Sequence, residues 1–408
     1  MTTWLFVLLV CYLPIVEKFL PGTDFGSGIP DLGPVRICSY LLIVALMVDF
    51  ALGRRIKVFY KWILILISYS IIVFASVSWS NYSYNSTTLP YLFDRVITPM
   101  IIAIIALNLF QNTTARNLYL KNILIASSVL ALISIVQLIL GGTMVLGEIR
   151  SAATFSNPNS LAIFLVLCIP CIIYASEKRM IPETIGWLII ALVAGGIVCT
   201  VSRKGMATAV LAVFIFYFLK KRFKKIMVFT ICLLPLAIGI AGYQVVSDRF
   251  SSEVMEKNIT GRTEMVLAGL DMFAKHPFFG LGYKGYYENF SKYFPYSNQE
   301  KYDAHNMYVT ALTDQGMLGF IPFLVVFLYP LYVSSGIVRS DDKKLLNPEL
   351  KDMAVICISS IIPFMLSGLF AGGLFYQHVV LFVLYANISM VLCCTKKSND
   401  IDQPCVKQ

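Results

Sequence analysis

Three side chains of the 408-residue sequence have the chemistry to bind a phosphate group and to move a proton beside it: Arg203, Arg262 and His305. Arginine stays charged and presents a planar fork of donors that suits phosphate, whereas histidine gains or loses a proton near neutral pH. Together they suit a diphosphate leaving group and an acceptor hydroxyl. Each also has a structural interpretation. Arg203 and Lys204 would flank a tight hairpin between helices, Arg262 would be a solvated loop residue, and His305 would cap a helix.

Four further residues are candidates to line the substrate: Arg150, Asn159, Asn306 and Tyr283. Arg150 and Asn159 stand on either side of an Asn-Pro pair, which is typical of a helix start and would otherwise form a second wall of the site. Asn306 follows His305 directly. Tyr283 belongs to an aromatic group that could stack on sugar rings or settle at lipid headgroups.

Two other motifs do not indicate cofactor or metal sites. The run Gly280 to Gly285 matches G-x-G-x-x-G, but no strand precedes it and no βαβ unit surrounds it, so we interpret its glycines as a turn that brings backbone close to another surface. Cys168 and Cys171 lie in an apolar run without further ligands, which favours packing. The three histidines have no metal-ligand spacing. We therefore expect no cofactor and a metal-independent mechanism.

The elements that carry these residues are membrane spans. Apolar residues make up 58% of the chain, charged residues 14%, and the mean hydropathy is +0.75, values far from those of soluble domains. The sequence predicts an all-α polytopic membrane protein of about twelve transmembrane helices, forming a single integral membrane domain over residues 1–408. The predicted spans are 3–20, 35–52, 62–79, 96–110, 121–140, 159–176, 184–201, 205–219, 226–246, 306–335, 352–371 and 375–394.

The net charge of +10 comes from basic residues whose distribution is explained by the topology of these spans, and it does not indicate a surface that binds nucleic acid. Basic residues gather in alternate connections, which predicts that these connections, both termini and a tail at 395–408 are cytoplasmic. The residues concerned are Arg54, Arg55, Lys57, Lys61, Arg116, Lys178, Arg179, Lys220, Lys221, Arg222, Lys224, Lys225, Arg339, Lys343 and Lys344.

The longest polar segment, 247–304, falls on the other side, between the ninth and tenth spans. At roughly sixty residues it exceeds ordinary helix connections, so we expect a functional or separately folded extracytoplasmic loop. Its first part, 249–275, has apolar residues at helical spacing, and the part from 276 to 302 is rich in turns and aromatic residues. Since Arg203 comes from a separate hairpin, we expect the site to lie beneath the loop, where it meets the span ends.

Three motifs resemble the O-antigen ligase and polymerase family, and the third is the most specific. They are Thr200-Val-Ser-Arg203-Lys-Gly205, then Gly261-Arg262 with His276-Pro-Phe-Phe-Gly280-Leu-Gly282, and His305-Asn306 followed after nine intervening residues by Gly316-Met-Leu-Gly319. In order and topology the likeness extends over the whole chain.

The resemblance implies a GT-C-like, inverting glycosyltransferase of the bacterial inner membrane, with its site facing the periplasm. The donor would be an oligosaccharide on undecaprenyl diphosphate and the acceptor another glycan or lipid A-core. Membrane lipids and a chain-length regulator are the other expected partners, and nucleic acid is not one. By the same resemblance Arg203 and Arg262 would hold the diphosphate, and His305 would activate the acceptor hydroxyl.

The resemblance leaves the exact function open. The run from Arg150 through Phe155 to Asn159 favours a repeat-unit polymerase, whereas Val266, where some members carry leucine, and the absence of evident arginine–glycine repeats weaken any assignment within the family. The alternative is a ligase that joins polymer to lipid A-core. An alternative of another class is a transporter or flippase of lipid-linked glycan, although the predicted spans hold few of the ionisable midplane groups that transporters use. A scaffold protein would make no demand on these polar positions.

Overall fold

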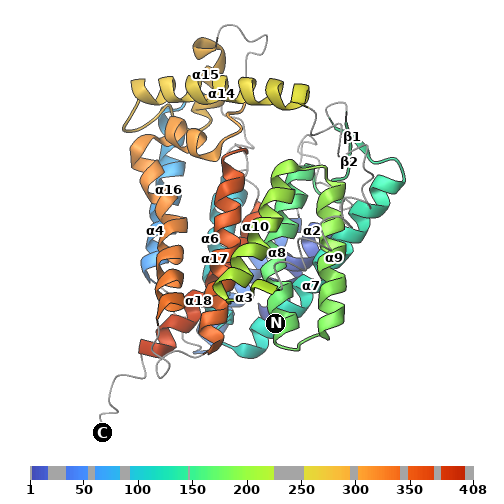
Figure 1. Cartoon of the computed structure of the whole chain (residues 1–408). Coiled ribbons are helices and arrows are strands. Elements are labelled where there is room, and N and C mark those ends of the chain that lie inside the picture. Colours follow the sequence, from blue (N-terminus) through green and yellow to red (C-terminus); the bar gives the residue numbers. More distant parts are fainter. Residues whose placement is uncertain are drawn as a thin grey trace.

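The computed structural model describes residues 2–16, 34–53, 60–82, 92–145, 148–224, 252–294, 302–340, 348–371 and 378–399. Its elements are, in order, α1 (Thr2–Val7), η1 (Leu8–Tyr12), α2 (Leu13–Val16), α3 (Pro34–Ala51), α4 (Tyr60–Ser76), η3 (Val77–Trp79), η4 (Phe93–Ile97), α6 (Thr98–Leu109), α7 (Thr113–Ile139), β1 (Thr143–Val145), β2 (Glu148–Arg150), α8 (Pro158–Glu177), α9 (Glu183–Cys199), α10 (Arg203–Leu219), α14 (Ser252–Lys275), α15 (Gly285–Tyr293), α16 (Met307–Arg339), α17 (Pro348–Gly368) and α18 (His378–Asn399). Most helices stand side by side in a bundle, and α14 crosses one end of it (Figure 1).

Within the described residues, five helices have the length and apolar composition to cross a bilayer. They are Lys61–Trp79, Thr113–Ile139, Pro158–Glu177, Met307–Arg339 and Pro348–Gly368. Shorter apolar helices accompany them at Thr2–Ile15, Ser39–Ala51, Arg95–Leu109, Glu183–Cys199 and Val379–Cys393. The chain is therefore a polytopic helical membrane protein, as predicted. The predicted ninth span, 226–246, and most of the predicted tail lie outside the described residues, so the number of twelve spans stays a prediction.

One small hairpin departs from the all-α prediction. Strands β1 and β2 pair antiparallel, with Thr143 opposite Arg150, in a segment predicted only as a polar connection. Gly141 and Gly142, both with positive φ, end α7 and turn the chain into the hairpin. Strands of three residues are too short to show the alternation of apolar and polar residues by which a strand is found.

The centre of the bundle is α8, nearly all of whose side chains are buried. Its backbone and side chains meet a polar group on α18, Asn387. Asn387 Oδ1 accepts hydrogen bonds from Tyr119 at 3.0 Å and Cys171 at 3.2 Å, while its amide donates to Leu167 O and Ser360 Oγ, each at 3.0 Å. Every polar atom of this buried amide thus has a partner, as a low-dielectric interior requires. The contacts join α7, α8, α17 and α18, and they give Cys171 the packing role that the sequence indicates.

Ion pairs gather at the opposite end of the bundle from α14. Glu177 accepts from Lys220 at 3.3 Å and from Arg222 at 2.6 Å, and Asp352 pairs with Lys178 at 2.8 Å and also with Lys220. These contacts tie together the far ends of α8, α10 and α17. Three of the basic residues predicted to be cytoplasmic therefore lie together, on the side away from α14.

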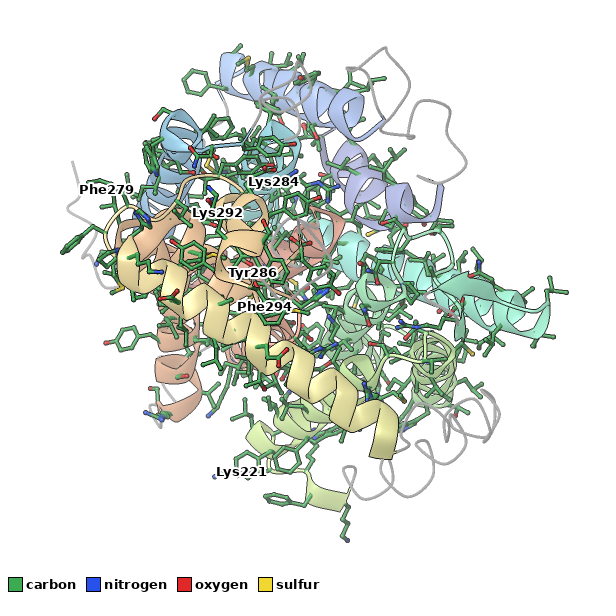
Figure 2. All side chains as sticks on the ribbon, turned by 90° about the horizontal axis from the view of Figure 1, so that it is seen from above. Lys221, Phe279, Lys284, Tyr286, Lys292 and Phe294 are labelled. Atoms are coloured by element: carbon green, nitrogen blue, oxygen red, sulfur yellow. The ribbon has the colours of Figure 1, made fainter. Side chains whose placement is uncertain are left out.

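The segment predicted as a long loop contains two helices. Helix α14, predicted from its spacing, lies across the bundle, and the view from above shows its diagonal course, with Tyr286 and Phe294 beside it (Figure 2). The sequence did not predict α15. A small apolar core, consisting of Met272, Tyr286, Phe290, Ala304 and Val309, joins α14, α15 and the start of α16. It fixes α14 relative to α16, and Gly269 permits the closest approach, since a Cβ there would lie 2.2 Å from Val309 Cγ1.

The glycine-rich turn before α15 fills a break in α16. At Gly316 the helix leaves helical geometry, with φ 59° and ψ −164°. The amides of Leu281 and Gly282 donate to the carbonyls of residues 313 and 314, both at 2.8 Å, and the amides of Met317 and Leu318 donate to the carbonyls of residues 277 and 278, at 2.8 and 3.1 Å. Irregular backbone in a membrane protein must be satisfied by protein in this way. The glycine run therefore forms a turn whose backbone lies close to that of α16, as the sequence indicates.

We expect Gly316→Ala to destabilise the protein strongly, because its backbone conformation is nearly exclusive to glycine and a Cβ would lie 2.3 Å from Phe278 O. The backbone strain alone costs about 1–3 kcal/mol. Thermal unfolding of the purified chain in detergent measures the effect. Gly336→Ala in the same helix is the matched control. Its Cβ would meet no atom within 4 Å, and it should leave stability unchanged or raise it by up to about 1 kcal/mol. Equal melting of the two variants would contradict the prediction.

Candidate functional site

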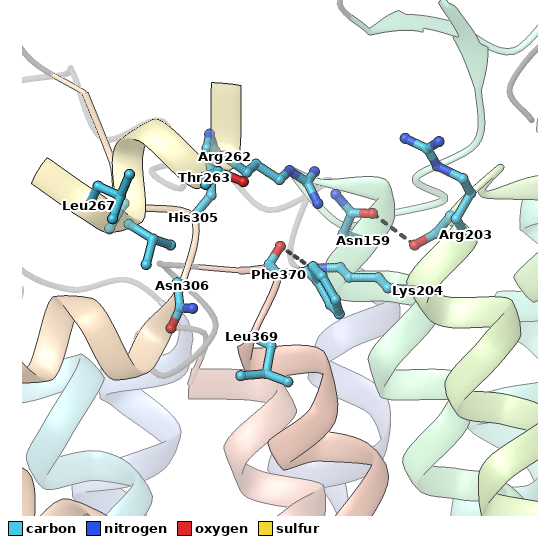
Figure 3. A pocket seen from close by; sticks show the side chains of 13 residues that line it. Asn159, Arg203, Lys204, Arg262, Thr263, Leu267, His305, Asn306, Leu369 and Phe370 are labelled. Carbon is cyan, nitrogen blue, oxygen red and sulfur yellow. Dashed lines mark hydrogen bonds between the residues drawn. The ribbon is translucent and has the colours of Figure 1, made fainter. Parts of the chain in front are cut away.

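A cavity of about 580 Å³ lies beneath α14, between it and the ends of the bundle helices. It brings together Arg203 from α10, Arg262 from α14 and His305 from the segment before α16 (Figure 3). Asn159 and Asn306 also line it, whereas Arg150 and Tyr283 do not. The complete lining consists of Asn159, Ser202, Arg203, Lys204, Arg262, Thr263, Val266, Leu267, Ala304, His305, Asn306, Leu369 and Phe370.

A braced turn presents Arg203 to the cavity. Ser202 is the N-cap of α10 and accepts from Gly205 N, and the preceding Val201 has a positive φ of 50°, which is unusual for a β-branched residue. Arg150 lies behind this turn with only 4% of its surface exposed. Its Nε donates to Thr200 O at 2.9 Å. Arg150 is therefore a buried support of the turn that carries Arg203, rather than part of the cavity wall.

Asn159 joins this support to the wall of the cavity. The cap of α8 is Asn157, whose side chain accepts from the backbone N–H of Asn159 at 2.8 Å. The side chain of Asn159 is thus not needed for the cap. Its Oδ1 accepts from Ser202 Oγ at 2.8 Å and from Arg150 Nη2 at 3.3 Å. The start of α8 and the start of α10 are held together at the cavity.

His305 owes its position to the cap of α16. Asn306 is the N-cap, and its Oδ1 accepts from Tyr308 N at 3.0 Å and Val309 N at 3.2 Å. The capping interpretation therefore applies to Asn306 and leaves the imidazole of His305 available to the cavity. His305 has a φ of 48°, and Tyr302 meets its ring edge-to-face, with centroids 5.3 Å apart. Both features define the direction of the imidazole.

Tyr283 is part of the fold rather than of the wall. Its side chain is 2% exposed and packs edge-to-face on Tyr82, with ring centroids 5.6 Å apart. Its backbone N–H donates to Ser76 O at 3.1 Å, and Ser80 Oγ donates to its carbonyl. The aromatic group around Tyr283 therefore anchors the turn to the end of α4, in the arrangement that Gly282 permits by its close approach to residue 80.

Eight of the thirteen lining residues were not singled out from the sequence as site residues, and Lys204, Leu369 and Phe370 are the three that add most to the character of the cavity. Lys204 follows Arg203, and a basic pair at a span end is typical of a flanking charge. Its Nζ donates to Phe370 O at 3.4 Å. Leu369 and Phe370 follow α17 and, with Val266 and Leu267, give the cavity an apolar side next to its cationic one. Such a combination suits an amphiphilic ligand with an anionic head.

The surroundings of His305 favour its neutral form. Burial lowers the pKa of His305, the charge of Asp303 raises it, and Arg262 and Lys204 lower it. The net result is a pKa below the ordinary histidine value. A neutral imidazole is the form that accepts a proton. Among the described residues, no three His, Cys, Asp or Glu side chains are grouped closely enough to hold a metal ion.

We expect the acid limb of kcat/KM for a reaction that uses His305 as a base to lie below pH 6.5, its ordinary pKa. A lowered pKa keeps the imidazole neutral to a lower pH, and the rate falls only as the pH drops through it. Since the charge of Asp303 raises this pKa, Asp303→Asn should move the limb to still lower pH. Glu264→Gln, which removes an exposed carboxylate on α14, should leave it in place. A limb that moves upward in Asp303→Asn would contradict the prediction.

Part of the chain is similar to a known protein family. Residues 187–324 match the family model described as O-antigen ligase, and this segment contains Arg203, Arg262 and His305. No curated protein matches the chain. The family supports a membrane glycosyltransferase role in O-antigen assembly. The match at residues 187–324 thus confirms the resemblance of the chain to the O-antigen ligase and polymerase family.

Proposed function

We propose that the chain is a metal-independent, inverting glycosyltransferase that moves a glycan from undecaprenyl diphosphate to an acceptor hydroxyl during surface polysaccharide assembly. The single observation that carries the proposal is the cavity lined jointly by Arg203, Arg262 and His305, within the matched segment. Its apolar side, with Leu369 and Phe370, suits the polyprenyl part of the donor.

In the proposed reaction the acceptor oxygen attacks the anomeric carbon from the face opposite the diphosphate. The bond from this carbon to the diphosphate oxygen breaks, and its electron pair stays on the diphosphate. The hydroxyl proton moves to His305, whose lowered pKa supports a role as base. Arg203 and Arg262 stabilise the negative charge on the leaving group, as preorganised cations do in a site shielded from water. One displacement of this kind inverts the anomeric carbon.

The proposal includes an orientation. The α14 end of the bundle, with segment 247–304 as a subdomain, would face the periplasm, and both termini with the 395–408 tail would lie in the cytoplasm. The ion-pair cluster of Glu177 and Asp352, which holds basic residues at the opposite end, supports this orientation through the positive-inside rule. A bilayer-spanning arrangement of about twelve helices of GT-C type in the bacterial inner membrane is part of the same proposal.

Between the two acceptors we propose a repeat-unit polymerase, on the sequence from Arg150 to Asn159. The description of the family model favours a ligase as the second candidate. Deleting the gene and separating the surface glycans on a gel tests the proposal. Core carrying a single repeat unit would identify a polymerase, and bare core with polymer left on the carrier lipid would identify a ligase. Unchanged surface glycan would contradict both, and flipping of lipid-linked glycan by the purified chain, without transfer, would indicate a transporter.

A further inference from the structure

Lys204 lies in the cavity beside the residues proposed to bind the diphosphate, and no step of the proposed transfer uses it. Its side chain extends from the first turn of α10 beneath Arg262 toward the chain that follows α17 (Figure 3). The bond that its Nζ donates to Phe370 O is 3.4 Å long. A charge-assisted bond of an ammonium group is typically about 2.7–2.9 Å. This carbonyl therefore holds the amine only weakly, and a better acceptor can replace it.

The charges that lower the pKa of Lys204 are both positive: Arg262 on α14 and Arg150 on β2. Arg203 stands next to it on α10, and the charge of Lys204 in turn lowers the pKa of His305, which favours the neutral form of that imidazole. The described residues that line the cavity include no Asp or Glu. A wall of this composition concentrates positive potential, and the ligand that lowers its energy is an anion with several charges.

The proposed reaction produces such an anion. In the donor each phosphate of the diphosphate carries a negative charge, and breaking the bond to the sugar leaves an additional negative charge on the released diphosphate. The guanidinium groups of Arg203 and Arg262 balance the two negative charges of the donor diphosphate. A further cation would stabilise the third negative charge, which the diphosphate gains when it is released. We propose that Lys204 is a third diphosphate-binding residue, which pairs with the charge that the leaving group gains. The inference rests on the proposed function and extends it to this residue.

Binding of a diphosphate by Lys204 should change the number of protons that the protein carries. Lys204 precedes the predicted span 205–219. Its pKa is lowered to about 7, first by burial and then by the charges of Arg262 and Arg150. At pH 8 the amine of the unliganded chain is therefore mostly neutral. A bound diphosphate favours the charged form, so that binding at this pH takes up a proton. An arginine at the same place would already be charged and would take up none.

The test is calorimetric titration of the purified full-length chain with inorganic pyrophosphate at pH 8, in buffers of different ionisation enthalpy. We expect the unaltered chain to take up about one more proton per pyrophosphate than Lys204→Arg. Lys204→Met, which keeps the length of the side chain but not its charge, should bind pyrophosphate roughly 10- to 100-fold more weakly, the effect of losing one hydrogen bond to a charged group. Lys121→Met, an exposed lysine on α7, is the matched control and should bind as the unaltered chain does.

The outcomes separate this inference from the proposed function. If the unaltered chain and Lys204→Arg take up equal numbers of protons, or Lys204→Met binds as tightly as the unaltered chain, the role of Lys204 is overturned while the diphosphate site stands. If the unaltered chain binds no pyrophosphate at any pH, the diphosphate site itself is overturned. Lys204→Arg should bind with an affinity close to that of the unaltered chain at pH 6, where both side chains are charged, which shows that the substituted chain is folded.

Discussion

His305→Ala is expected to lower the rate of glycan transfer by about 10²- to 10⁴-fold, the range that a positioned general base contributes. His305 is uncharged at neutral pH, as a base must be, because burial and the charges of Arg262 and Lys204 lower its pKa. Tyr302 and the cap at Asn306 set the direction of its ring. Among the described residues that line the cavity, no other is a histidine. The measurement is single-turnover transfer by the purified chain from a lipid-diphosphate donor.

His276→Ala is the matched control. His276 is exposed at the end of α14, and the structure uses its backbone, which accepts from Gly280 N at 3.1 Å, rather than its imidazole. The control should retain the rate of the unaltered chain, while pyrophosphate binding by His305→Ala should persist, because the arginines remain. Normal transfer by His305→Ala would exclude the imidazole as the base. Loss of both transfer and pyrophosphate binding would indicate a structural role for it instead.

Much of the bundle follows from hydropathy alone. The predicted span 159–176 corresponds to α8 (Pro158–Glu177), and 205–219 to α10 (Arg203–Leu219). Long apolar runs bounded by charge leave little choice of structure in a membrane, where backbone must be hydrogen-bonded internally. Helix α15 and the break at Gly316 could not be predicted from hydropathy, because both depend on contacts between the turn at 277–282 and α16. A contact across distant segments leaves no periodic signal in either one.

The candidate site could be predicted to the extent that topology decides it. Span ends on one side of a membrane share a surface, and this is why the sequence alone predicts that Arg203, Arg262 and His305 lie near one another; their roles stay predictions. Packing decides whether a residue faces the cavity or is buried behind the residues that line it. Arg150 is buried behind the turn at Thr200, and Tyr283 is buried against Tyr82. Neither position can be read from residue type.

Arg262→Ala is expected to lower kcat/KM for transfer by about 10²- to 10³-fold, as the loss of one donor to a developing anion does. Arg262 comes from α14, which the small core at Met272 and Val309 fixes over the cavity, so its guanidinium group is positioned before the substrate arrives. The variant should also change the pH profile. Because the charge of Arg262 lowers the pKa of His305, its removal should raise that pKa and move the acid limb of the rate to higher pH.

Arg262→Lys separates the charge of this residue from its geometry. A lysine keeps the charge that acts on His305, so the acid limb should stay where it is in the unaltered chain, yet it lacks the planar fork that binds a diphosphate bidentately, so most of the rate should remain lost. Arg339→Ala, an exposed arginine at the far end of α16, should change neither quantity. A lysine variant with full activity would show that Arg262 acts only as a distant charge. If Arg262→Ala lowers the rate but leaves the acid limb of the pH profile where it is, Arg262 lies away from His305 in the working enzyme. A cation that binds the leaving diphosphate in this cavity lies beside His305, and its charge must therefore lower the pKa of that imidazole.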